Sequence, residues 1–144
     1  ALGLAQMARL DELLAARRRV ARAYAQALAG LDELHLPPMA GPDRASWFVY
    51  VVRLDDRFTR ADRDAVLRRL RRAGIGCSNY FAPIHTQPFV MELLGTRAGQ
   101  FPQTERVADR TVALPFFPAM TDGQVAAVAE ALKAALCRAP AAVR

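Results

Sequence analysis

The residues best suited to chemistry in this 144-residue chain lie in one segment, residues 77–89, with the sequence CSNYFAPIHTQPF. It combines amide, phenol, hydroxyl and imidazole groups with aromatic and apolar neighbours. Loops of this composition are where proteins commonly hold small ligands. We therefore expect ligand contacts from the polar and aromatic side chains of this segment: Asn79, Tyr80, Phe81, His85 and Gln87.

Each of these residues also has a purely structural interpretation. His85 can serve as a loop histidine that is hydrogen-bonded within the protein. Tyr80 can be a packed core ring with a satisfied hydroxyl, and Cys77 can be a packing residue. The sequence leaves both interpretations open.

A complete catalytic apparatus is not evident in the sequence. The two histidines, His35 and His85, do not form a histidine–carboxylate pair with helical ligand spacing, so we expect no metal site. No GxSxG, P-loop or GxGxxG motif occurs, and Ser46 and Ser78 lack the context of an activated nucleophile. We therefore assign no catalytic residue from the sequence.

The composition is that of a globular protein, with 53% hydrophobic and 24% charged residues. The formal net charge is +6, from 19 arginines and one lysine set against 14 acidic residues. Such a basic chain could attract DNA, RNA or a phosphate-bearing small molecule, and charge alone does not choose among them. No apolar run reaches the roughly 20 residues that span a bilayer, and the N-terminal order of charges differs from a signal peptide. We expect a cytoplasmic protein that does not enter membranes.

Two helices are predicted in the first half of the chain. Apolar residues at three-four spacing over residues 4–29 predict one long helix, with Gly30 as its stop. Residues 59–73 predict a second helix, in which Thr59 and Asp62 form a capping box.

Three strands and a last helix complete the expected elements. Residues 47–54, WFVYVVRL, have the near-continuous apolarity of a strand covered on both faces. Residues 75–80 and 112–114 predict two further short strands, and short helices are expected near 89–94 and 103–110. Thr121 and Gln124 form a capping box for the last helix.

This order of elements predicts an α+β fold, in which helices pack on a small, mostly antiparallel three-stranded sheet. We expect residues 1–30 to be a long connecting helix and residues 31–144 to be a compact domain. A chain that begins inside an uncapped helix is expected to be a piece of a longer protein.

Three stretches together resemble one protein family. The first is ALGLAQ at residues 1–6, with Leu10-Asp11 and the arginines that follow. The second is GIGCSNYFAPIHTQPF at residues 74–89, which is similar to a "GI…Y.P.H.QP" segment. The third, at residues 101–121, combines an "FP..E" with an "LP.FP..T" pattern. All three, in this order, resemble the DegT–StrS sugar aminotransferases, and the resemblance covers essentially the whole chain.

The resemblance implies the C-terminal small domain of a fold-type-I, pyridoxal-phosphate-dependent enzyme that is active as a homodimer. Such enzymes transfer an amino group, commonly from glutamate, to a nucleotide-linked keto-sugar in amino-sugar, polysaccharide or antibiotic biosynthesis. In that family the Schiff-base lysine and the other cofactor-binding residues lie upstream of this region. The only lysine here, Lys133, lies outside the matching motifs. We therefore expect no cofactor-binding residue and no turnover in this chain alone.

The same resemblance implies that segment 79–87 touches the substrate. His85 is expected to hydrogen-bond the sugar or its diphosphate, while Tyr80 and Phe81 shape the wall. Two other functions remain open. One is a non-catalytic interaction or regulatory module derived from this fold. The other is a nucleic-acid-binding domain that uses the basic sequence RRLRR at residues 68–72, although we expect no nucleic-acid partner.

Overall fold

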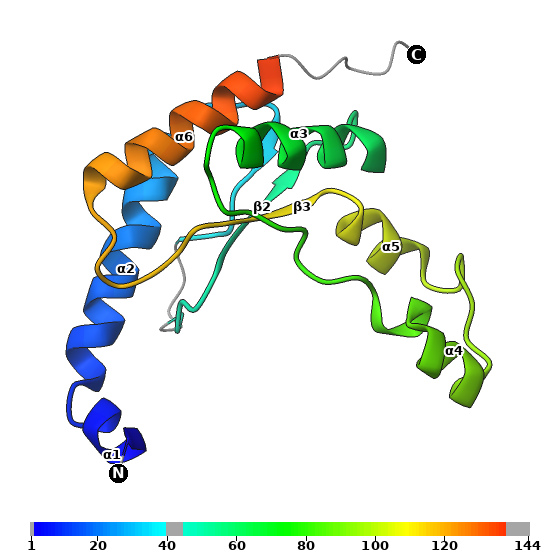
Figure 1. Cartoon of the computed structure of the whole chain (residues 1–144), viewed down its shortest axis with the longest axis horizontal. Coiled ribbons are helices and arrows are strands. Elements are labelled where there is room, and N and C mark those ends of the chain that lie inside the picture. Colours follow the sequence, from blue (N-terminus) through cyan, green and yellow to red (C-terminus); the bar gives the residue numbers. More distant parts are fainter. Residues whose placement is uncertain (1, 40–44, 138–144) are drawn as a thin grey trace.

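A three-stranded antiparallel sheet forms the centre of the molecule (Figure 1). The computed structural model describes residues 2–39 and 45–137. The strands are β1 (Leu34–His35), β2 (Tyr50–Leu54) and β3 (Thr111–Leu114), with β2 in the middle. Tyr50 pairs with Leu114, and Leu34 pairs with Leu54. The expected α+β class with a three-stranded antiparallel sheet is confirmed.

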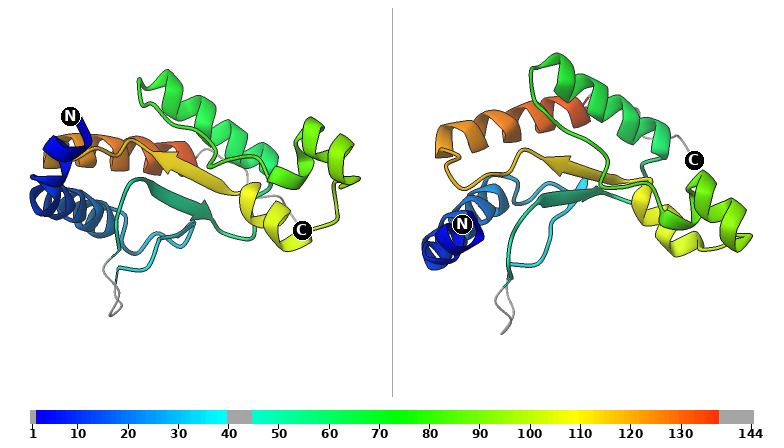
Figure 2. Two further views of the ribbon diagram at one scale, coloured as in Figure 1. Left: turned by 90° about the horizontal axis from the view of Figure 1, so that it is seen from below. Right: turned by 60° about the horizontal axis from the view of Figure 1, so that its bottom comes forward.

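Long helices cover one side of this sheet, and a group of short helices extends away from it. Helices α3 (Arg60–Arg72) and α6 (Asp122–Cys137) lie on the same side of the sheet, and α2 (Leu10–Ala27) packs against α6 (Figure 2). The 3-10 helix η1 (Ile84–Thr86), α4 (Pro88–Leu94) and α5 (Pro102–Ala108) form what we call the arm, on the far side of the sheet from α2 (Figure 1).

The core lies between the sheet and the long helices. Tyr50, Val52 and Leu54 alternate along β2 and are all fully buried, whereas Val51 and Arg53 point the other way and are half-buried. Among residues 2–39 and 45–137, helices cover only one face of β2, so the expectation of a strand covered on both faces is not met within this part of the chain. The strand is also shorter than predicted, since residues 47–49 precede the ladder.

The predicted single helix over residues 4–29 is interrupted. Helix α1 (Leu2–Met7) ends before α2 begins, and Arg9 has φ −114° and ψ 18°, outside helical values. Leu4 and Met7 are largely exposed, so the first turns have no packing partner among the described residues. Most helical stability comes from packing an apolar face, and that support begins only near Val20, where burial starts.

The predicted strand over residues 75–80 is also absent. Ser78 makes one isolated bridge with Ala113, at 2.8 Å from the Ala113 N–H to the Ser78 carbonyl. The guanidinium of Arg71 donates to the Cys77 carbonyl, at 3.1 and 3.2 Å, so this carbonyl is directed to α3 rather than to a strand ladder. The third strand is instead the two-residue β1, for which the sequence predicts no strand.

Local capping predictions are confirmed. The Thr59 side chain accepts from the Asp62 N–H, and the Asp62 carboxylate accepts from the Thr59 N–H in return. Thr121 and Gln124 make the same reciprocal pair at the start of α6. Gly74 follows α3 with φ +77°, a left-handed conformation that glycine adopts without strain.

Candidate functional site

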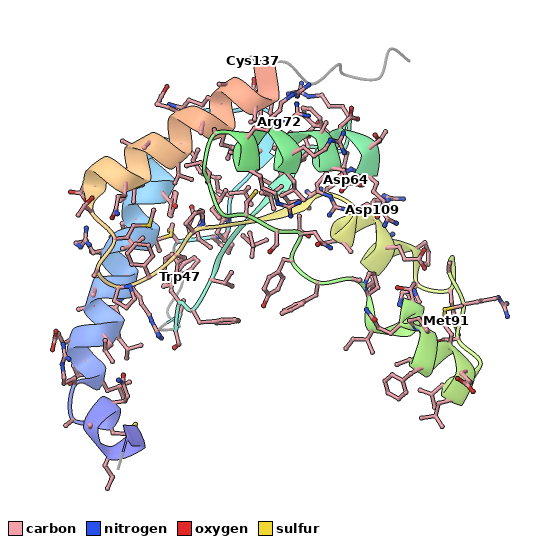
Figure 3. All side chains as sticks on the ribbon, viewed as in Figure 1. Trp47, Asp64, Arg72, Met91, Asp109 and Cys137 are labelled. Atoms are coloured by element: carbon pink, nitrogen blue, oxygen red, sulfur yellow. The ribbon has the colours of Figure 1, made fainter. Side chains whose placement is uncertain are left out.

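The arm borders an open hollow of about 850 Å³. One wall is the segment between Tyr80 and His85, and the opposite wall is α5. Figure 3 shows the arm between the labelled residues Met91 on α4 and Asp109 at the end of α5, well away from Trp47. The residues that line the hollow are mostly apolar: Tyr80, Phe81, Ala82, Pro83, Ile84, His85, Val90, Leu94, Thr96, Phe101, Gln103, Thr104, Val107, Ala108 and Thr111.

The predicted ligand contacts divide into two groups. Tyr80, Phe81 and His85 line the hollow together. Asn79 is half-buried and Gln87 is exposed at the start of α4, and neither of them lines it. The structure thus brings the middle of the predicted segment to one concave surface and leaves its two ends outside.

His85 is fixed within the arm. It is only 8% exposed, and its Nε2 lies 2.8 Å from Oε1 of Glu105. Its ring meets the Phe101 ring edge-on, with 4.8 Å between centroids, and its carbonyl accepts from the Thr96 hydroxyl at 2.7 Å. His85 is therefore a hydrogen-bonded loop histidine and a wall of the hollow at the same time.

Glu105 is the residue of this site that sequence reasoning missed as a functional candidate. Besides His85, its carboxylate accepts from the Gly99 N–H, at 2.8 and 2.9 Å to its two oxygens, and from the Phe101 N–H at 3.4 Å. The hydrogen bond from His85, followed by that from Gly99, lowers the pKa of Glu105 below its ordinary value. The available signal was the glutamate of the "FP..E" pattern, whose position in the first turn of a short helix directs it back toward the preceding loop.

Phe81 has an unusual backbone for a bulky residue. Its φ is +55°, in the left-handed region, and it is the one non-glycine residue with positive φ among those described. The side chain is 72% exposed, and its ring lies 4.6 Å from the Tyr80 ring. Residues held in such sparsely populated backbone conformations cluster at functional sites in proteins.

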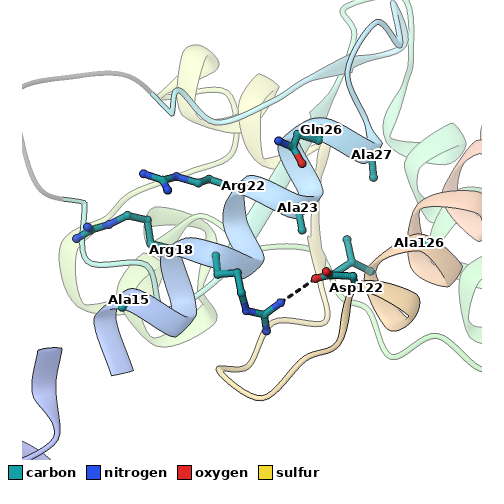
Figure 4. Close-up of a pocket in the computed structure, with 10 residues that line it drawn as sticks. Ala15, Arg18, Arg22, Ala23, Gln26, Ala27, Asp122 and Ala126 are labelled. Atoms are coloured by element: carbon teal, nitrogen blue, oxygen red, sulfur yellow. Dashed lines mark hydrogen bonds and ion pairs between the residues drawn. The ribbon is translucent and has the colours of Figure 1, made fainter. Parts of the chain in front are cut away.

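A second hollow, of about 640 Å³, lies between α2 and α6 (Figure 4). Arg19 crosses it to bind Asp122, at 2.8 Å, and the Met120 carbonyl. Arg18 and Arg22 extend to the other side of α2 in this view, and alanines form much of the floor. The ion pair between Arg19 and Asp122 joins the two helices. No residue of segment 79–87 lines this hollow.

Lys133 is unsuited to hold pyridoxal phosphate. It lies on α6 and makes an ion pair with Glu130 one turn away, at 2.8 Å. It lines neither of the two hollows. A Schiff-base lysine needs a desolvated site with cofactor-binding groups around it, and the surroundings of Lys133 do not fit that requirement.

Residues 2–39 and 45–137 contain neither a metal-type cluster nor a membrane-spanning helix. No group of three or more metal-ligating side chains comes together within these ranges. None of the helices in the same ranges is both long and apolar enough to cross a bilayer.

Solved structures of aminotransferases share this fold. The chain is similar to the aminotransferase TlmJ from Streptoalloteichus hindustanus, with 32% identity and a TM-score of 0.79, over 94% of this chain and 35% of TlmJ. It is similar to the sugar aminotransferase CalS13 from Micromonospora echinospora, with 30% identity and a TM-score of 0.72, over 92% of this chain and 33% of CalS13.

The putative sugar aminotransferase Spr1654 from Streptococcus pneumoniae, in its PMP form, shares the fold with a TM-score of 0.88 at 22% identity, over 96% of this chain and 34% of that protein. The chain thus spans about a third of the length of each of these structures. The model of the DegT/DnrJ/EryC1/StrS aminotransferase family matches residues 1–133. Because that model matches nearly the whole chain, this chain belongs to the DegT/DnrJ/EryC1/StrS aminotransferase family.

Proposed function

We propose that this chain is the C-terminal small domain of a pyridoxal-phosphate-dependent aminotransferase that acts on a nucleotide-linked keto-sugar. The observation that carries the proposal is the family match over residues 1–133, in a chain that spans about a third of its structural relatives. CalS13, a sugar aminotransferase at 30% identity, supports a sugar as the substrate.

The proposal assigns cofactor binding to one part of a longer protein and substrate contact to another. The remainder of that protein provides the lysine and binds the cofactor, which supplies the electron sink for amino transfer. Lys133 does not fit the role of that lysine, because it lies beside Glu130 on α6 and lines neither hollow. The 144-residue chain alone is therefore inactive and binds no cofactor covalently.

In this division the arm forms the substrate-side wall. Tyr80 and Phe81 provide apolar surface against one face of the sugar, and His85 provides a polar contact within the same hollow. Closing such a wall over a bound sugar excludes water from the reacting centre. Asn79 and Gln87, at the two ends of the segment, contact the parts of the substrate that extend beyond the hollow.

We also propose a cytoplasmic homodimer that uses glutamate as the amino donor. The face of α1 and the start of α2 support the dimer, because Leu4, Met7 and Leu10 are exposed apolar side chains along one stretch. Exposed apolar patches of this kind often mark contacts with another protein surface.

The test compares the longer protein that contains this chain with the chain by itself. With glutamate and a panel of nucleoside-diphosphate keto-sugars, the longer protein should form amino-sugar product and the 144-residue chain should form none. Borohydride reduction in the presence of pyridoxal phosphate should label a lysine outside this chain. Labelling of Lys133, abolished by Lys133→Arg, would overturn the proposal.

A non-catalytic interaction module remains the second candidate, because several large apolar side chains of the arm are exposed, among them Ile84, Phe89 and Leu93. The same assay separates the two functions. A longer protein that folds, lacks a cofactor lysine and forms no amino-sugar product would favour the interaction module.

A further inference from the structure

The carboxylate of Glu105 determines how His85 can meet a ligand. Backbone N–H groups only donate, and the N–H groups of Gly99 and Phe101 both point at this carboxylate. A carboxylate surrounded by donors is stabilised in its ionised, acceptor-only form. The lowered pKa of Glu105 agrees with this conclusion.

An acceptor-only partner requires that the contacting nitrogen of His85 carry the proton. Nε2 of His85, 2.8 Å from Oε1 of Glu105, therefore carries a proton, and it is the N–H nitrogen whenever the ring is neutral. In that tautomer Nδ1 carries the lone pair and can only accept a hydrogen bond. Nδ1 has no hydrogen-bond partner within the part of the chain that the structure describes, and His85 lines the hollow.

We infer that Glu105 is a positioning residue that holds His85 in its Nε2–H tautomer and reserves Nδ1 to accept a hydrogen bond from a hydroxyl group of the bound sugar. The inference rests on the proposed function and specifies which part of the substrate His85 contacts. A diphosphate oxygen carries no proton to donate at neutral pH, so an accepting Nδ1 can pair with a hydroxyl of the sugar ring and not with the diphosphate.

The surroundings make such a contact selective. Most of the lining is apolar, so an analogue without the matching hydroxyl leaves Nδ1 of His85 without a partner from the ligand. Sites built to hydrogen-bond a substrate hydroxyl discriminate strongly against analogues that lack it, because the site's own polar group then loses its partner.

The first experiment measures the tautomer directly and needs no enzymatic activity. The ¹⁵N spectrum of histidine-labelled 144-residue chain at about pH 8, where an unperturbed histidine is neutral, contains only His35 and His85, and His35→Gln assigns the pair. His85 should be mainly Nε2–H, and Glu105→Gln should shift it toward a mixture. The matched control Glu130→Gln, which breaks a surface ion pair on α6, should leave the His85 tautomer unchanged.

Two results would overturn the inference in this experiment. One is an Nδ1–H tautomer in the unmodified chain, and the other is a tautomer that Glu105→Gln does not alter. Both results are independent of whether the longer protein is a sugar aminotransferase, so they separate this inference from the proposed function.

The second experiment tests the ligand contact in the longer protein. His85→Gln places an amide near the Nε2 position, so it retains a donor for Glu105 and removes the Nδ1 acceptor. With the unmodified enzyme, one singly deoxygenated analogue of the substrate should raise KM roughly tenfold, as expected for one lost hydrogen bond. With His85→Gln, that analogue and the parent substrate should have the same KM.

If every deoxygenated analogue changes KM equally in the unmodified enzyme and in His85→Gln, Nδ1 does not contact the sugar. A Glu105→Gln enzyme should raise KM for the sugar with little change in kcat, because the positioned acceptor affects binding. A loss of kcat with unchanged KM would contradict the positioning role.

Discussion

The rings of Tyr24 and Tyr50 stack 4.8 Å apart in the core, and only one of their two hydroxyls has a hydrogen-bond partner. The Tyr24 hydroxyl donates to the Pro115 carbonyl at 2.7 Å and lies 3.7 Å from the sulfur of Met120. The Tyr50 hydroxyl is buried without a partner among the described residues. Because both side chains are 0% exposed, the pair differs in polar contacts rather than in burial.

Removal of the two hydroxyls should therefore have opposite effects on stability. Tyr50→Phe should raise the free energy of unfolding by about 1 kcal/mol, since it removes an unpaired buried polar group, and Tyr24→Phe should lower it by about 1 kcal/mol. Urea denaturation of both variants measures the difference. If Tyr50→Phe proves as destabilising as Tyr24→Phe, the Tyr50 hydroxyl has a partner such as a buried water.

The raised pKa values of the same two tyrosines predict that the fold loses stability at alkaline pH. Burial raises the pKa of Tyr50 to about 12, and burial and the neighbouring Tyr50 ring also raise the pKa of Tyr24. A raised pKa means that the folded state keeps its proton when the unfolded state has lost it, so stability falls as pH rises. The loss should begin near the ordinary tyrosine pKa of about 10 and continue to about 12, at no more than about 1.4 kcal/mol per pH unit for each residue.

Denaturant titrations between about pH 8 and pH 12 measure this loss. Tyr50→Phe should reduce the slope, because only Tyr24 then contributes through this core pair. An unchanged slope in Tyr50→Phe would assign the alkaline loss to other groups.

The lowered pKa of Glu105 predicts a loss of stability at acidic pH. The hydrogen bonds from His85 and Gly99 lower its pKa from the ordinary 4.5, so the ionised form stabilises the fold. This contribution is fully present above the unfolded-state value and is lost as pH falls through the lower, folded-state value.

The difference in stability between the unmodified chain and Glu105→Gln should therefore be largest at neutral pH. It should decrease steadily once pH drops below 4.5. Denaturation midpoints of the two proteins measured in parallel provide the comparison. A difference that stays constant through this acid range would show that the carboxylate charge of Glu105 does not contribute.

The backbone conformation of Phe81 predicts an unusual order of stability among its substitution variants. Because its φ is +55°, Phe81→Gly relieves strain that Phe81→Ala retains, and the glycine variant should be the more stable of the two by about 1 kcal/mol. Phe117 is the control, since it is also exposed but does not have positive φ. There the order should reverse, because glycine adds unfolded-state entropy and relieves no strain.

Both pairs can be compared by urea denaturation. In the longer protein, either substitution of Phe81 should also weaken sugar binding, because each removes the exposed ring. An alanine variant as stable as the glycine variant would mean that the chain near Phe81 relaxes without cost.

Much of the fold could be predicted because its determinants are local. The start of α3 depends on Thr59 and Asp62, three positions apart, and the start of α6 depends on Thr121 and Gln124 in the same way. The central strand follows from β-branched and aromatic residues in succession over β2. Such cues act within one or two turns of chain, so they can be detected without knowledge of the partner elements.

Errors in the prediction arose where distant contacts decide the conformation. Segment 75–80 has strand-like composition, but Arg71 binds its Cys77 carbonyl, and one bridge to Ala113 is all that remains of a ladder. Helix α1 has helical periodicity, but nothing among the described residues packs on Leu4 and Met7. Propensity selects among conformations that tertiary packing has already made possible, and composition alone does not report that packing.

By itself the sequence determined the α+β class, the starts of α3 and α6, and the segment that holds Tyr80, Phe81 and His85. Its three motifs also indicated the family. Only the tertiary structure decided that Glu105, 20 positions beyond His85, meets its Nε2, and that Phe81 adopts a left-handed backbone. The physical reason is that a hydrogen bond between residues on different elements depends on how those elements pack, and packing is a property of the whole chain.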